Sequence, residues 1–216
     1  MILDFLFPNR CLECNLIIEG DEIICSACYS HIDFSHFGFN ANHLLLQRCR
    51  SLFPTDNAFA RMLFGKENLA RKILHQLKYG NREIIGKILA LWTIQKLTFE
   101  PNLPDLITTI PLHSSKQKQR GFNQLHLFGN ILSEHYQIPI DHQLLKRNTS
   151  NKAQARRNKE QRSNYNNQFS LNKEVNNQHV LIIDDVFTTG NTMSRAAWEI
   201  LSGNNNKISI LVMAID

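Results

Sequence analysis

One segment near the C-terminus constrains the fold more than any other part of the chain. It begins with an apolar run, residues 180–183, which Asp184 and Asp185 follow directly. A loop rich in Gly and Thr comes next, and residues 192–201 then have helical spacing. A buried strand that leads through a tight loop into a helix is the building unit of α/β proteins with parallel sheets.

This unit also suits a phosphorylated sugar, because ligands of open α/β sheets bind at the carboxyl ends of the strands. Gly190 lets the backbone approach an anion, and the N–H groups of the helix start favour a phosphate. The two carboxylates can accept hydrogen bonds from sugar hydroxyls. The alternative is that Thr192 only caps the helix and the acids only end the strand. The candidate binding residues are Asp184, Asp185, Thr188, Thr189, Gly190, Asn191 and Thr192.

The chain from about residue 66 alternates between helical and strand patterns. We expect helices over 67–79, 83–99, 122–136 and 192–201, and strands over 106–110, 138–145, 179–183 and 207–215. The alternation predicts an α/β fold with a mainly parallel sheet flanked by helices. Gly203 is expected at the C-terminal end of the last helix. Trp92 and Trp198 lie on apolar helix faces and are expected in the core.

Positive charge is concentrated in residues 146–162. Seven Lys and Arg residues stand there against one acid, Glu160, so this segment carries +6 while the whole chain carries +5. Residues 146–168 hold almost no core-forming side chains, which favours a mobile loop. Three interpretations stay open: a lid attracted to an anionic ligand, a solvated loop, or a contact with DNA phosphates.

Residues 1–50 hold all five cysteines. Cys11 and Cys14 form one CxxC pair, and Cys25 and Cys28 form a second after ten intervening residues. Four thiolates at this spacing predict a structural Zn²⁺ site. The alternatives are a redox pair or buried free thiols, with His31 as a substitute ligand. Cys49 is expected in the core.

The chain shows no export signal and no apolar run near the ~20 residues of a membrane span, so we expect a cytoplasmic address, where metal-binding cysteines are common. The predicted domains are a zinc module, 1–50, and an α/β domain, 51–216.

Residues 180–192 resemble the signature of type I phosphoribosyltransferases for PRPP, which is 5-phosphoribosyl 1-diphosphate. The whole chain resembles the ComF family of competence proteins, which includes the GntX-like proteins. The resemblance rests on the four-cysteine module beside the PRPP signature and on further motifs, which are Leu-Phe-Pro-Asn-Arg-Cys at 6–11, Gln-Leu-Lys-Tyr-Gly at 76–80, Ile-Pro-Leu-His at 110–113, Arg-Gly-Phe-Asn-Gln at 120–124, and Arg147, Gln154, Asn164 and Phe169.

The resemblance implies a role for further residues. Asp184 and Asp185 would contact the ribose hydroxyls, and the loop from Thr188 to Thr192 would hold the 5′-phosphate. Residues 111–115 would face the diphosphate and its Mg²⁺, and residues 146–169 would close over the ligand. Pro111, Arg120 and Lys78 join the candidate site, although a cation at a helix end such as Lys78 is ordinarily a surface residue. Asn123 and Gln124 are expected to cap the helix that follows them.

Two functions follow from the resemblance. One is a module that binds PRPP or a nucleotide and serves DNA uptake in natural transformation, where it handles single-stranded DNA with DNA-uptake proteins. The other is an active phosphoribosyltransferase that joins a nitrogen base to ribose 5-phosphate and releases diphosphate. The sequence presents no recognisable pocket for an acceptor base. It also presents no basic platform interleaved with aromatic residues of the kind that commonly binds single strands.

Overall fold

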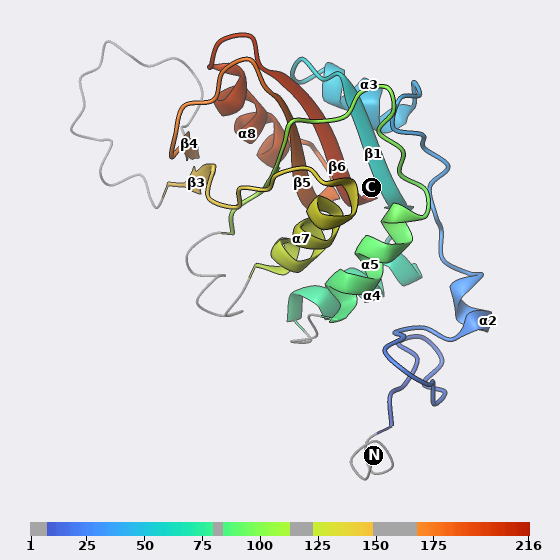
Figure 1. Ribbon diagram of the computed structural model, residues 1–216. Helices are drawn as coiled ribbons and strands as arrows, with labels where there is room; N and C mark the ends of the chain where they lie inside the picture. The colour runs from blue at the N-terminus through green and yellow to red at the C-terminus, as the bar shows by residue number, and fades with distance from the viewer. Residues whose placement is uncertain (1–7, 80–83, 113–122, 149–167) are drawn as a thin grey trace.

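A parallel sheet forms the centre of the protein, as the alternating pattern predicted. The computed structural model describes residues 8–79, 84–112, 123–148 and 168–216. Within them, four strands pair in the order β1-β6-β5-β2, and every neighbouring pair runs parallel (Figure 1). The strands are β1 (Asn57–Leu63), β2 (Leu106–Thr109), β5 (His179–Phe187) and β6 (Lys207–Ile215).

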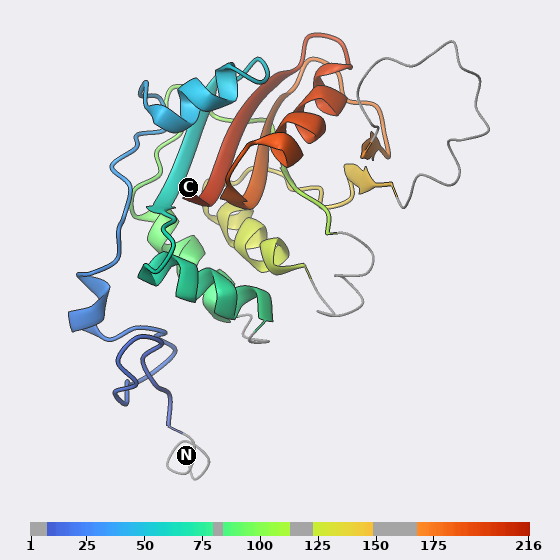
Figure 2. The ribbon, with the colours of Figure 1, turned by 180° about the vertical axis from the view of Figure 1, so that it is seen from behind.

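Helices cover both faces of this sheet. The opposite views in Figures 1 and 2 show α5 (Ile84–Ile94) and α7 (Gln124–Tyr136) on one face. They show α3 (Leu44–Arg50) and α8 (Asn191–Leu201) on the other face, while α4 (Leu69–Tyr79) packs beside α5. A sheet covered in this way has no solvent-facing side, which is why β5 and β6 are apolar over most of their length.

Two elements at the start of the α/β fold were not predicted. Strand β1 contains Asn57 and Arg61, both of which are buried in the structure. These polar side chains interrupt the apolar pattern by which a central strand is recognised. Helix α3 precedes β1 and packs against it with Leu45, Leu46 and Cys49 buried. The prediction that Cys49 is a core residue is confirmed.

The predicted strand over 138–145 is wrong. Between residues 138 and 144 only Ile140 pairs, in a single parallel bridge to Ile107. Pro139 has no N–H to donate, and the Asp141 carboxylate accepts from the Gln143 N–H at 2.8 Å, which turns the chain. The strand β3 (Leu145–Arg147) begins after this turn and pairs antiparallel with β4 (Phe169–Leu171). Lys146 and Arg147 belong to β3 and not to the loop predicted over 146–168, and residues 149–167 of that loop lie outside the described residues.

Three smaller predictions have different outcomes. Trp92 is buried, as predicted, but Trp198 is 39% exposed and donates its indole N–H to the Leu52 carbonyl at 3.3 Å. Gly203 lies at the end of the last helix, directly after its C-cap residue Ser202, and its φ is not positive. A side chain at this position would collide with the Val175 carbonyl, so close packing explains the glycine.

The N-terminal module attaches to the sheet through aromatic rings. It contains the short helix α2 (Ser26–Tyr29), and Tyr29 and Phe34 lie edge-on to Trp92 of α5 with ring centroids 5.2 and 5.7 Å away. The guanidinium of Arg61 in β1 stacks on the Phe34 ring at 3.8 Å. Burial lowers the pKa of Arg61, whose Nε has no hydrogen-bond partner among the described residues. The aromatic face therefore compensates a buried cation.

None of the helices in the described ranges combines the length and apolar character that crossing a membrane requires.

Candidate functional site

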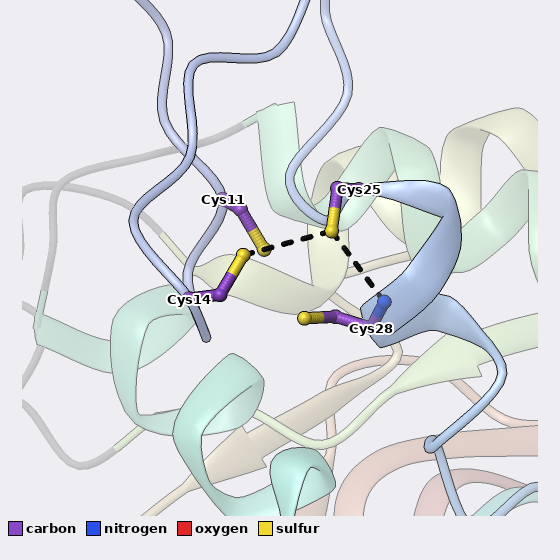
Figure 3. A group of neighbouring side chains, drawn as sticks. All are labelled: Cys11, Cys14, Cys25 and Cys28. Carbon is purple, nitrogen blue, oxygen red and sulfur yellow. Dashed lines mark hydrogen bonds between the residues drawn. The ribbon is translucent and has the colours of Figure 1, made fainter.

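The four cysteines of the two CxxC pairs meet in one cluster (Figure 3). Cys11 begins a tight turn, in which the Cys11 backbone N–H donates to the Leu16 carbonyl at 2.8 Å. Cys25 caps α2, and its sulfur accepts from the Cys28 N–H at 3.4 Å. These local turns hold both sulfurs of each pair on the same side of the chain, so the sulfurs of all four residues lie within 4.8 Å of one another.

This geometry fits a tetrahedral zinc ion. Zn–S bonds of about 2.3 Å place two thiolate sulfurs about 3.8 Å apart, and the Cys14 and Cys25 sulfurs are 3.6 Å apart. Burial opposes ionisation of Cys11, but backbone N–H groups of its neighbours outweigh it and lower the pKa of this thiol to about 6. Burial and the adjacent thiols raise the pKa of Cys28 to about 12. Cys11 thus favours the thiolate unaided, whereas Cys28 needs a cation to hold its thiolate.

A second site lies at the carboxyl ends of β2 and β5. A cavity of about 230 Å³ opens there between these strands, the last turn of α4 and the first turns of α7 and α8. The sequence-predicted residues that line it are Lys78, Pro111, Asp184, Asp185 and Thr192. Arg147 of β3 also lines it and donates to the Pro111 carbonyl at 3.4 Å. Arg120 lies outside the described residues.

The two acids belong to β5 itself, because the strand runs to Phe187, four residues further than predicted. Lys78 reaches Asp185 across the cavity, with Nζ 2.8 Å from Oδ2, and both side chains are about three-quarters buried. Lys78 at the end of α4 therefore supplies the cation that the paired acids require, although it is 107 residues away in the sequence (185 minus 78).

Asp184 has a different environment from Asp185. Burial, and next the charge of Asp185, raise the pKa of the Asp184 carboxyl to about 8, although Lys78 and Arg147 attract its ionised form. One of its oxygens accepts from the Asp185 N–H at 2.8 Å. The pair therefore presents one carboxylate and one carboxyl that is largely protonated at neutral pH, a combination that can both accept and donate hydrogen bonds.

The Gly/Thr loop after β5 has the tight conformation that its sequence suggests. Gly190 is the N-cap of α8 with φ of 77°, and no side chain caps the helix. A Cβ at Gly190 would lie 2.7 Å from the Phe187 ring and would also collide with Leu52. Thr188, Thr189 and Asn191 are exposed around this helix start. The loop therefore leaves backbone N–H groups and hydroxyls available to an anion.

Arg48 of α3 supports this loop from outside and was not predicted. Its guanidinium donates to the Thr188 carbonyl and lies 5.3 Å from the centre of the Phe187 ring. No sequence signal identifies it, because Arg48 and Thr188 are 140 residues apart. Asn123, by contrast, caps α7 as predicted, since its Oδ1 accepts from the Leu125 N–H at 3.0 Å. Its amide also donates to the Ile110 carbonyl at 3.2 Å and fixes the chain before Pro111.

Comparisons with known proteins match both parts of the chain. Residues 2–37 match the double zinc ribbon domain family and residues 127–216 match the phosphoribosyl transferase domain family. The first range contains the four cysteines, which supports structural zinc. The second contains most of α7 and all of β5 and α8, and with the flanked parallel sheet it confirms the predicted fold class.

Similar proteins come from several bacteria. Competence protein F of Haemophilus influenzae is 30% identical over 204 residues, which cover 87% of this chain and 89% of that protein. The DNA utilization protein YhgH of Escherichia coli is 29% identical over 196 residues, which cover 87% and 82%. A solved structure of adenine phosphoribosyltransferase from Leishmania donovani covers 85% of this chain and 86% of its own, with a TM-score of 0.36 and 13% identity. At 30% identity over most of both chains, the match to competence protein F shows that the chain belongs to the ComF family that its motifs resemble.

Proposed function

We propose that this protein binds PRPP, or a related ribose 5-phosphate nucleotide, and serves DNA uptake or utilisation in the cytoplasm. The observation that carries the proposal is the cavity at the ends of β2 and β5, where paired acids, cations and an open helix start surround one space. The names of the relatives, competence protein F and DNA utilization protein, support the biological part.

Each part of the cavity suits one part of the ligand. The carboxyl groups of Asp184 and Asp185 would bind the two ribose hydroxyls, one mainly as donor and one as acceptor. The loop from Thr188 to Thr192 would surround the 5′-phosphate, because Gly190 holds the backbone N–H groups of the helix start open. Arg147 and the chain at Pro111 would face the diphosphate.

Magnesium belongs to the ligand in this proposal. Mg²⁺ prefers oxygen ligands and commonly binds through substrate phosphates with one or two carboxylates. The ammonium of Lys78 already compensates Asp185, so the acids hold together without a resident divalent ion. We therefore expect Mg²⁺ to arrive with the diphosphate, and the chain's own residues to bind and orient the ribose.

Calorimetric titration with PRPP and Mg²⁺ tests the site. Asp185→Asn removes the charge that Lys78 neutralises and should weaken binding by about 1.5–3 kcal/mol, the usual scale for hydrogen bonds to charged groups. Asp105→Asn provides a control, because this acid lies at the opposite end of the sheet, where it accepts from the His179 N–H at 2.8 Å. Equal affinity of wild type and Asp185→Asn would refute the assignment.

The same preparation distinguishes a binding module from an enzyme. A phosphoribosyltransferase forms a bond between a nitrogen of the acceptor base and ribose C1 as the bond to diphosphate breaks. If the protein is an enzyme, incubation with PRPP, Mg²⁺ and a panel of nucleobases will release diphosphate from PRPP. We expect PRPP binding without base-dependent release. Release with any one base would identify the acceptor and replace the binding role with the enzymatic one.

A further inference from the structure

Two side chains at the end of α3 lie directly behind the loop that would hold the 5′-phosphate. The Arg48 guanidinium donates to the Thr188 carbonyl, and Leu52 packs so closely on Gly190 that a Cβ at this glycine would collide with it. The Trp198 indole of α8 donates to the Leu52 carbonyl at 3.3 Å. The end of α3 therefore contacts both the loop and the helix that follows the loop. Arg48 and Leu52 are called the α3 support below.

The Arg48 guanidinium joins two segments at the edge of the sheet. It donates to the Thr188 carbonyl, which follows β5, and to the Asp216 carbonyl, which follows β6. These segments also contact each other, because the Asp216 N–H donates to the Phe187 carbonyl at 3.0 Å. The donors of a guanidinium form a rigid planar fork, so one arginine can fix both carbonyls at once. The chain is therefore held from α3 at the point where it leaves β5.

This contact sets the direction of an N–H group that an anion could use. The Thr188 carbonyl and the Thr189 N–H belong to one peptide unit, which is planar and trans, so they point in opposite directions. Because Arg48 holds the carbonyl on the side of α3, the Thr189 N–H points away from α3. It donates to no group in the part of the chain that the structure describes. An N–H that is oriented before the ligand arrives binds an anion without further ordering of the loop.

Leu52 restricts the next part of the same loop. Gly190 has φ of 77° and packs against both Leu52 and the Phe187 ring. Glycine has wide conformational freedom, so these contacts are what keep the start of α8 in one conformation. The Leu52 side chain is itself 36% exposed. Its truncation should therefore affect the loop more than the core.

We propose that Arg48 is a positioning residue for ligands that carry a ribose 5′-phosphate. It acts through the peptide unit between Thr188 and Thr189 and does not itself contact the ligand. The inference rests on the proposed function. Arg48 lies outside the two ranges that match domain families, 2–37 and 127–216, so neither match assigns it this role. The diphosphate would lie at another part of the cavity, beside Pro111 and Arg147, and should not depend on Arg48.

Calorimetric titration with two ligands tests this role. PRPP with Mg²⁺ carries both the 5′-phosphate and the diphosphate, whereas inorganic diphosphate with Mg²⁺ carries only the second group. Arg48→Gln should weaken PRPP binding about 10-fold, the lower end of the scale for one hydrogen bond to a charged group, and should leave the affinity for diphosphate unchanged. Leu52→Ala should weaken PRPP binding by less and also spare diphosphate. The matched control is Arg50→Gln on the same helix, because Arg50 donates to the Thr55 and Asp56 carbonyls, each at 3.0 Å, before β1.

The pattern across ligands and variants decides the proposal. Wild-type affinity for PRPP in Arg48→Gln would refute the positioning role. An equal fall for both ligands would also refute it, because a general loss of structure has that effect. A thermal melt of each variant shows whether it folds, and if Arg48→Gln does not, an unchanged PRPP affinity of Leu52→Ala refutes the role instead. A wild-type protein that does not bind PRPP refutes the proposed function and the positioning role with it, whereas PRPP binding that neither substitution weakens refutes the positioning role alone.

Discussion

Replacing Asp184 with asparagine should stabilise the protein relative to the wild type, and this advantage should grow as the pH rises from 5 to 7. Burial, and next the charge of Asp185, raise the pKa of this carboxyl from 3.8 to about 8, so the folded protein holds a proton there that the unfolded chain releases. An acid whose pKa is higher in the folded state contributes stability that is complete below pH 3.8 and is lost as the pH rises through 8. Asparagine keeps the shape of the side chain and has no proton to lose.

The size of this effect follows from the width of the interval. Each pH unit between the two pKa values lowers the free energy of unfolding by about 1.4 kcal/mol, so two units give at most about 2.7 kcal/mol. The side chain is only partly buried, and Lys78 and Arg147 attract its ionised form. We therefore expect the advantage of Asp184→Asn over the wild type to grow by roughly half that limit between pH 5 and pH 7.

Urea denaturation at pH 5, 6 and 7 measures this difference. Asp141→Asn is the matched control, because the hydrogen bond and charge of Lys173, 2.7 Å away, outweigh burial and lower the pKa of Asp141. That carboxylate is ionised in the folded and unfolded protein throughout this range, so its substitution should destabilise by a constant amount. If the difference between Asp184→Asn and the wild type is also constant from pH 5 to 7, the folded protein does not hold a proton on Asp184 and the reasoning fails.

Three further predictions concern other parts of the molecule. Protein purified without added metal should contain about one zinc ion per chain, and Cys25→Ser should reduce soluble yield because structural zinc contributes to folding; an intramolecular disulfide without zinc would contradict this. Gly190→Ala should lower the melting temperature by roughly 4–8 °C, from a strain of about 2 kcal/mol at φ of 77°, whereas the exposed Asn191→Ala should not. Burial and the adjacent His126 lower the pKa of His142 to about 4, so the free energy of unfolding should fall as the pH drops from 6.5 to 4. The fall should be smaller in His142→Gln, and an equal pH dependence of wild type and variant would show that His142 does not cause it.

The sequence predicted those parts of the molecule that local chemistry determines. The succession of β5, the Gly/Thr loop and α8 follows from neighbouring residues, and so does the spacing that brings Cys11, Cys14, Cys25 and Cys28 together. Strand β1 escaped prediction because Arg61 is buried in it, and a buried arginine contradicts the usual pattern of a central strand.

Contacts between distant elements account for the other differences. The pairing of Lys78 with Asp185 and the support of Thr188 by Arg48 depend on how helices dock on the sheet. Trp198 was expected in the core because its helix has an apolar stripe, but the edge of that stripe faces solvent. Tertiary packing decides such positions, and helical periodicity alone does not.

The buried arginine of β1 couples the stability of the central sheet to the metal site. The ring that covers the Arg61 guanidinium is Phe34, which follows directly after the cysteine turns, while Arg61 lies in the central sheet. Removing the metal would loosen the segment that carries this ring and leave a cation without compensation inside the sheet layer. Chelation should therefore appear as a single cooperative loss of structure, and a chain shortened to begin after residue 37 would keep a charge in its core with nothing to cover it.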